Sequence, residues 1–293
     1  MSRREFLHAG AAAGLALAGG MHIGAALLGA ADLRPRANCI FIANTGGMSQ
    51  LDLWDPKPGA PAEIRGAFSP IHTNVPGLFI SELLPHTARI ADKLAIVRGM
   101  THEETEHIPA SRLMMAGCEL LMSEYRHRDL ELCGSATFDI SREPDSARQA
   151  YGDSDLGRQC LKACRMVEAG RPLVTIRNGH WDTHSQNAWC LKELLAPSLD
   201  QALSALVVDL GQRGLLDSTL VVVATEFGRS PRINSRAGRD HWPAAFSIVM
   251  AGGGIDGGRA VGATDAHGRR VIDRPIIPAD LTFQFDARSP FNN

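Results

Sequence analysis

The sequence predicts an α/β protein with three layers, in which helices cover both faces of a central, mostly parallel sheet. Short apolar runs rich in β-branched residues alternate with helical patterns, as is typical of such sheets. With 293 residues, 44% of them hydrophobic, the chain can also bury a large core. The expected strands are Cys39 to Ala43, Leu94 to Arg98, Leu173 to Arg177, Thr219 to Thr225 and Phe246 to Ala251.

Two helices are expected between these strands. Leu199, Leu203, Leu206, Val207 and Leu210 recur on one helical face, and Gly214 follows as a stop. A second helix, 156–168, ends at Gly170 and leads into the strand at Leu173 by a short turn. Two segments fit this alternation poorly: 54–76, expected to be a long surface loop, and 118–146.

Composition narrows the classes of partner. Thirty basic and thirty-two acidic residues give a net charge of −2, which indicates no nucleic-acid-binding surface. Six scattered cysteines do not form the paired close-spaced knuckles of a zinc site, and Cys160 and Cys164 are expected to be buried thiols on one helix face.

The N-terminus has the layout of a twin-arginine export signal. Arg3 and Arg4 precede an Ala- and Gly-rich apolar run from Ala9 to Ala31. We therefore expect a signal peptide at 1–31, one mature domain at 32–293, passage through the twin-arginine export machinery, and a periplasmic or secreted product. An uncleaved anchor is the alternative, but the Gly-rich run contains His22, so no stable membrane span is expected in the mature form.

Polar or glycine-rich segments follow the strands, and ligands bind at that edge of a parallel sheet. The segment 44–52 offers paired glycines with Ser49 and Asp52 facing a ligand, or else a glycine turn with these residues capping a helix. The segment 101–107, which ends at His107, suits metal binding or proton transfer, or is a solvated acidic loop.

Three further segments supply carboxylates and imidazoles. Asp182 and His184 are two residues apart on an extended stretch, hence on one side of it. Glu226 ends an apolar run, where a buried carboxylate needs a neutralising partner, either an arginine such as Arg229 or Arg232 or a metal. Asp240 and His241 place another carboxylate and another imidazole next to each other in the sequence. Such ligands suit Zn, Mn, Mg or Fe.

A glycine pattern after the last expected strand is not a nucleotide signature. Gly252, Gly254 and Gly257 have the spacing of a dinucleotide fingerprint, but the residues that follow, 259–268, are turn-like where the fingerprint needs a helix.

Several of these motifs, in order, resemble a bacterial family called domain of unknown function 1501. The resemblance implies a twin-arginine signal and a fold similar to the alkaline phosphatase and sulfatase superfamily, which binds metal through Asp, Glu and His and transfers phosphoryl or sulfuryl groups. It rests on Gly-Gly-x-Ser-x-x-Asp at 46–52, Trp-Asp-Thr-His at 181–184, Glu-Phe-Gly-Arg-Ser-Pro at 226–231, Gly-Arg-Asp-His-Trp at 238–242 and Ala-Gly-Gly-Gly-Ile at 251–255.

The resemblance also implies a set of metal ligands and a shortened chain. A segment between Gly117 and Phe138 is expected to be missing relative to the family, and the chain ends soon after Asp280. No Cys/Ser-x-Pro-x-Arg motif is present, which disfavours a formylglycine sulfatase. The implied ligands are Asp182, His184, Glu226, Asp240 and His241, with Asp52 as a sixth.

The sequence therefore predicts an exported, divalent-metal-dependent hydrolase of a phosphate or sulfate ester, acting on a small molecule or a polysaccharide. Ser49 or bound water is the expected nucleophile, His107 the expected proton-transfer group and Arg229 the expected anion ligand. The alternatives are a non-catalytic exported binding protein or an inactive shortened relative, and a cytoplasmic nucleotide-binding protein in which Arg3 and Arg4 are coincidental.

Overall fold

A computed structural model of the chain describes residues 38–125 and 135–281. The expected signal at 1–31 lies outside these residues, as does the chain end beyond 281. The expected missing segment between Gly117 and Phe138 falls largely on residues 126–134, which are also outside them. These expectations stay predictions.

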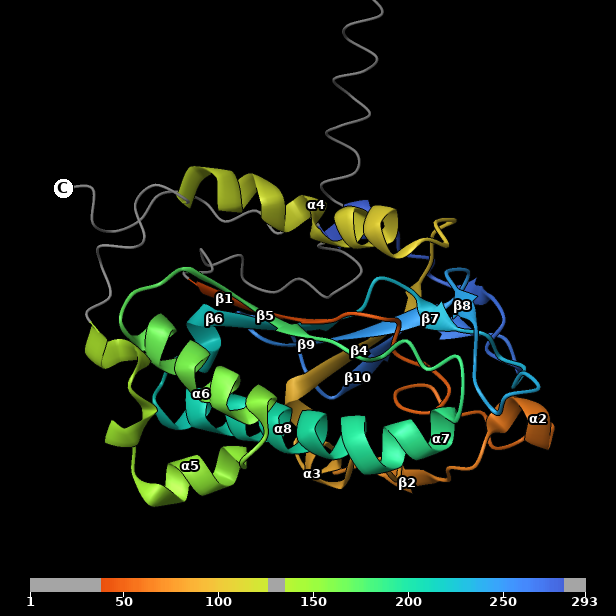
Figure 1. Ribbon diagram of the computed structural model, residues 1–293, viewed down its shortest axis with the longest axis horizontal. Helices are drawn as coiled ribbons and strands as arrows, with labels where there is room; N and C mark the ends of the chain where they lie inside the picture. Colours follow the sequence, from red (N-terminus) through yellow and green to blue (C-terminus); the bar gives the residue numbers. More distant parts are fainter. Residues whose placement is uncertain (1–37, 126–134, 282–293) are drawn as a thin grey trace, which may run out of the picture.

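The core of the protein is a mixed sheet of six strands with helices on both faces (Figure 1). The strand order is β10-β4-β9-β6-β1-β5. All five expected strands are present, and β10 at one edge was not expected. The six strands are β1 (Asn38–Asn44), β4 (Leu94–Met100), β5 (Leu173–Asn178), β6 (Thr219–Ala224), β9 (Phe246–Gly252) and β10 (Arg259–Val261).

The sheet is mostly parallel, as expected, but β9 runs against the other five strands, which corrects the expectation that every following loop lies at one edge. β1 pairs in parallel with β5 and β6, and β10 with β4, but β9 is antiparallel to both β4 and β6. The reason is the connection from β6, which contains no crossover helix: residues 225–245 turn back at the edge where β6 ends. Gly252 to Gly254 therefore lie at the opposite edge, and the chain continues into β10 rather than a helix.

Two hydrophobic clusters hold the layers together. One lies between the sheet and helices α6 (Asp155–Glu168) and α8 (Ala196–Gln212), and the other lies on the face covered by α4 (His107–Tyr125). Strand residues alternate between the clusters, so that Ile40 and Ile42 face the first and Phe41 faces the second.

Local signals explain α6, one of the two predicted helices. Ser154 caps α6 by accepting a hydrogen bond from the Gly157 amide, and Gly170 follows it at φ 89°. Cys160 and Cys164 are buried on α6, as expected.

The helical stretch Asn187–Gln212 is long and apolar enough to cross a membrane, judged by length and composition alone. Half of its most apolar part is buried inside the protein, as in the core helix of a globular domain.

Short elements complete the described chain. The expected surface loop at 54–76 contains a helical turn, a strand and the fully buried Trp54, so it is packed against the body. These elements are α2 (Ala62–Arg65), β2 (Pro70–His72), β3 (Phe79–Ser81), α3 (Pro85–Ala88), η1 (Ala91–Lys93), η2 (Ser135–Phe138), η3 (Ile140–Arg142), α5 (Asp145–Tyr151), α7 (Asn187–Cys190), η4 (Leu191–Leu195), η5 (Leu216–Ser218), β7 (Gly228–Arg229), β8 (His241–Trp242), β11 (Ala263–Thr264), β12 (Val271–Asp273) and η6 (Pro278–Leu281).

Candidate metal centre

Five segments far apart in the sequence meet at one edge of the sheet. Strands β1, β4, β5 and β6 end there, and antiparallel β9 begins there. The strand ends deliver Gly46, His107, Asp182 and Glu226, and the segment before β9 delivers His241. Except for Ser49 and Asp52, every expected site residue lies in this cluster or in direct contact with it.

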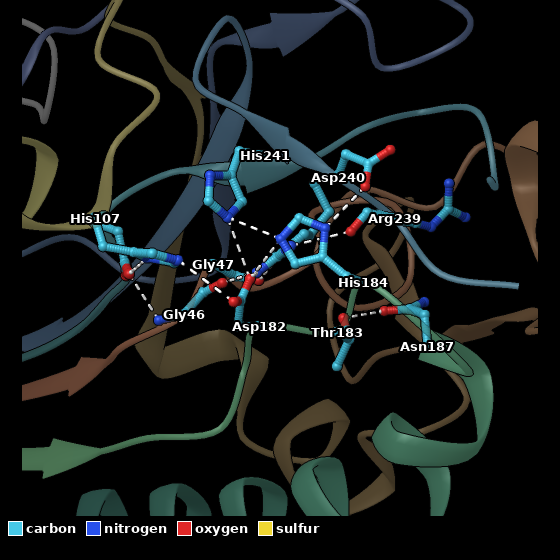
Figure 2. A network of polar contacts seen from close by, with 12 residues as sticks. Gly46, Gly47, His107, Asp182, Thr183, His184, Asn187, Arg239, Asp240 and His241 are labelled. Atoms are coloured by element: carbon cyan, nitrogen blue, oxygen red, sulfur yellow. Dashed lines mark hydrogen bonds and ion pairs between the residues drawn. The ribbon is translucent and has the colours of Figure 1, made fainter. Parts of the chain in front are cut away.

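Asp182 lies at the centre of the cluster (Figure 2). Its Oδ1 atom is 3.0 Å from His184 Nε2 and 3.2 Å from His241 Nε2, and its Oδ2 atom is 3.5 Å from His107 Nε2. The side chain is 44% exposed. One carboxylate is therefore shared by three imidazoles at an accessible position.

The other ring nitrogen of each histidine is held by an oxygen acceptor. His241 Nδ1 donates to the Thr105 carbonyl at 2.7 Å, and because a carbonyl can only accept, this nitrogen carries the proton. His184 Nδ1 donates to Asp240 at 2.8 Å, and His107 Nδ1 donates to Glu226 at 2.7 Å. In the neutral rings, all three Nε2 lone pairs then point into the space around Asp182.

Glu226 is a buried carboxylate whose partners the sequence did not identify. It is 3% exposed and accepts hydrogen bonds from the Gly46 amide at 2.7 Å and from the Thr225 hydroxyl at 3.2 Å, besides His107. Neither expected arginine, Arg229 or Arg232, forms a hydrogen bond or ion pair with Glu226, but the charge of the nearby Arg229 acts on it. Glu226 therefore orients His107 and the glycine loop.

The glycine loop requires both of its glycines. Gly46 has φ 117°, and a Cβ atom there would lie 2.4 Å from the Asp182 backbone nitrogen. Gly47 has φ 93° and packs against Phe227 and Arg229. The glycines thus let the backbone approach the Asp182 segment.

Arg229 is fully buried and fully engaged. Its guanidinium donates to Asp182 Oδ1, to the carbonyls of Gly46 and Gly47, and to the carbonyl of Arg239. Burial by itself would raise the pKa of Asp182, but the hydrogen bond and charge of Arg229, together with smaller contributions from His184 and His241, hold that pKa below its ordinary value. Arg229 therefore keeps Asp182 ionised and in place, rather than reaching outward to an anion.

Ser49 and Asp52 are buried outside the histidine cluster. Both Asp52 oxygens accept from Arg239, at 2.8 and 3.1 Å, and Oδ2 also accepts from Asn187 and from Ser49 at 2.5 Å. Ser49 is 1% exposed and Asp52 2%. Their hydrogen bonds tie the glycine loop to α7 and to the segment before β8. Ser49 and Asp52 therefore have a structural role, as in the second alternative above, but through these contacts rather than by capping a helix.

An open cleft of about 420 Å³ adjoins Asp182, His107 and Glu226. Sequence reasoning did not single out Arg112 and Arg177, which also line it. The signal was present, because positions 108, 112 and 115 share one face of α4 and Arg177 is the second-last residue of β5.

The donor set fits a metal ion. Among the described residues, His107, Asp182 and His241 each offer one ligand atom, and these atoms lie within 4.8 Å of one another. His184 Nε2, 3.0 Å from His241 Nε2, borders the same space. Asp240 lies behind His184 as its hydrogen-bond partner. The arrangement of outer acceptors fixing imidazole tautomers is that of protein metal sites.

The comparison with protein families agrees with the motifs. Residues 36–125 and 123–289 match the model of the family described as Protein of unknown function (DUF1501). The chain belongs to this family. No curated protein matches the chain. The two matched stretches of this DUF1501 member together include every residue of the cluster.

Proposed function

We propose that this DUF1501 protein is an exported metal-dependent hydrolase of a phosphate or sulfate ester. The proposal includes passage through the twin-arginine machinery, predicted from the N-terminal sequence, and a fold similar to the alkaline phosphatase and sulfatase superfamily, implied by the family resemblance. The observation that carries the catalytic part is the convergence of three imidazole Nε2 atoms on Asp182.

This convergence is electrostatically unfavourable without a positive charge at the ring nitrogens, because Arg229 donates to Asp182 Oδ1 and to carbonyls rather than to the imidazoles. Lone pairs of His184 and His241 face each other at 3.0 Å, and both face a carboxylate oxygen. Protonation of one ring or a bound cation relieves the repulsion. The outer acceptors on Nδ1 favour the cation, because they hold all three rings in the tautomer that leaves Nε2 free to ligate.

The ligand chemistry narrows the metal. We infer that His107, Asp182, His184 and His241 hold it, with Asp240 and Glu226 orienting two of the rings. Imidazole-rich sets suit Zn or Fe, whereas Mg prefers oxygen ligands, so Zn and Fe lead among Zn, Mn, Mg and Fe. When bound, such an ion supplies Lewis-acid polarisation of an ester oxygen and a water of lowered pKa.

Contacts and burial of the remaining residues suggest which group supplies the nucleophile and which transfers a proton. Ser49 is buried and donates its hydroxyl to Asp52, so water is the favoured nucleophile over Ser49. The open cleft beside Asp182 gives an ester access to the site. His107, between Glu226 and Asp182, combines metal binding with the proton-transfer role expected from the sequence.

Metal analysis of the full chain tests the proposal. We expect stoichiometric metal in the wild type, loss of it in Asp182→Ala and His241→Ala, and retention in His86→Ala, an exposed histidine on α3. The wild type should then hydrolyse 4-nitrophenyl phosphate or 4-nitrophenyl sulfate, and the two site variants should not.

Two results would count against the proposal in different ways. A folded wild type without metal would overturn it. Bound metal with no ester turnover would favour the second function considered above, a non-catalytic exported binding protein or an inactive shortened relative.

A further inference from the structure

Two arginines on the walls of the cleft have no partner among the residues that the structure describes. Arg112 lies on α4 and Arg177 near the end of β5, and both side chains are exposed. Neither guanidinium makes a hydrogen bond or ion pair with any residue in the described ranges 38–125 and 135–281. Both cleft-lining charges therefore remain available to a ligand.

The arginines next to the cleft differ from the buried arginines of the site. Arg229 and Arg239 are fully buried, and their guanidinium donors are taken by carboxylates and carbonyls. An arginine presents a planar set of donors that matches the oxygens of a phosphate. Free guanidiniums beside the candidate metal ligands are thus placed for an anionic group.

The charges of the residues around the cleft indicate which class of anion it would bind. Asp182 and Glu226 are the two carboxylates of the lining, and Arg112 and Arg177 offset them. Behind the lining, the charges of Arg229 on Asp182 and of Asp240 on His184 cancel each other, so a divalent cation held by the cluster leaves an excess of about two positive charges. A phosphate monoester carries two negative charges above its second pKa of about 6, whereas a phosphodiester or a sulfate monoester carries one.

We propose that Arg112 and Arg177 make the cleft selective for phosphate monoesters over phosphodiesters and sulfate monoesters. This inference rests on the proposed function and narrows its substrate class. Arg112, from α4, and Arg177, from the end of β5, both bind non-bridging oxygens of the phosphate. The exposed Ile108 and the half-buried Met115 line the same wall and contact the organic part of the ester.

Binding of small esters to the metal-loaded full chain tests the selectivity. Methyl phosphate, dimethyl phosphate and methyl sulfate are similar in size and differ in charge, and each is titrated by calorimetry at pH 8. We expect the wild type to bind methyl phosphate at least tenfold more tightly than the other two. Arg112→Gln and Arg177→Gln should each weaken methyl phosphate binding by about tenfold and affect dimethyl phosphate less.

Matched controls separate charge from folding. Arg89→Gln removes an exposed arginine beside α3, outside the cleft, and should bind methyl phosphate like the wild type. Arg177→Lys should restore part of the affinity, because the charge returns without the planar donors. Elemental analysis should show full metal content in every arginine variant.

The outcomes of the two proposals are distinguishable. Arginine variants with full metal and wild-type affinity for methyl phosphate would overturn the selectivity inference while leaving the metal centre intact. Absence of metal from the wild type would overturn the proposed function, and the same titration of the metal-free chain would still measure the contribution of the arginines. Equal wild-type affinity for the three esters would also contradict the inference.

Discussion

Asp240 and His184 are joined by a hydrogen bond of 2.8 Å between Oδ1 and Nδ1, and this bond aims His184 Nε2 at Asp182. The same bond is the largest cause that holds the pKa of Asp240 below its ordinary value; burial alone would raise this pKa, and the hydrogen bond from Asn234 lowers it further. Asp240 is thus a positioning residue in this geometry.

Replacing Asp240 tests that assignment. Asp240→Ala is expected to weaken metal affinity by about 10- to 100-fold, because His184 loses the acceptor that fixes its tautomer. Asp240→Asn keeps an oxygen acceptor and should recover part of the affinity. Competition with a chromogenic chelator measures both. If Asn fails as completely as Ala, a direct ligand role for Asp240, as the sequence predicted, fits better.

Gly46 is expected to tolerate no side chain. Gly46→Ala places a Cβ atom against the Asp182 backbone, so the loop and Asp182 must separate and metal content should fall. Gly77 is the matched control: its φ is also positive, at 81°, but a Cβ there meets no atom within 4 Å. Gly77→Ala should therefore cost only backbone strain, about 1 kcal/mol, with full metal content. Similar metal loss in both variants would contradict this view of the loop.

The Asp52–Arg239 pair is expected to be essential for folding stability. Both side chains are almost completely buried. Arg239→Gln leaves the Asp52 carboxylate buried without its cation, and we expect a loss of about 3 to 5 kcal/mol in the free energy of unfolding, measured with urea. Lys93→Gln, which breaks an exposed pair with Asp92, should cost at most about 1 kcal/mol. Equal losses in the free energy of unfolding for the two variants would show that burial does not determine how much an ion pair stabilises the fold.

Glu143 gives the protein an acid-sensitive contribution to stability. It pairs with Arg165 and with Arg213, which ties α6 to the end of α8. Burial would raise its pKa, but Arg213 and Arg165 outweigh burial and hold the pKa below 4.5. Because the folded pKa is lowered, this stabilisation is present above the unfolded pKa and is lost as pH falls through the folded pKa.

The corresponding variant is Glu143→Gln. It should be less stable than the wild type at pH 7, and the difference should shrink below about pH 4.5 as the wild-type carboxylate becomes protonated. Urea unfolding at several pH values measures this. A difference that stays constant down to pH 3 would exclude an electrostatic origin.

Export is the prediction that depends on the N-terminal sequence. Changing both Arg3 and Arg4 to Lys should keep the protein in the cytoplasm of a bacterial host, because twin-arginine transport reads this pair. Fractionation followed by immunoblotting measures the location. Unchanged export of the variant would disprove the assigned route, and a wild type that stays in the cytoplasm would disprove export itself.

The sequence alone determined the elements and most of the cluster. Short apolar runs rich in β-branched residues and period-3.6 patterns lie within windows of about ten residues, so the strands near Ile40 and Val222 and the helix around Leu203 could be predicted directly. Asp182 and His184 were predicted because they follow an expected strand, where a parallel sheet binds ligands, and His241 because it stands next to a carboxylate; the family resemblance implied all three as ligands.

The tertiary structure alone decided strand direction and the partners of each polar side chain. The antiparallel β9 brings His241 to the edge where β6 ends, and no local periodicity encodes that direction. Asp52 was predicted as a ligand, yet it pairs with Arg239, 187 residues away in the chain. Hydrogen-bond partners of buried charges are set by contacts between distant segments, because burial forces each charge to find a partner wherever the fold supplies one.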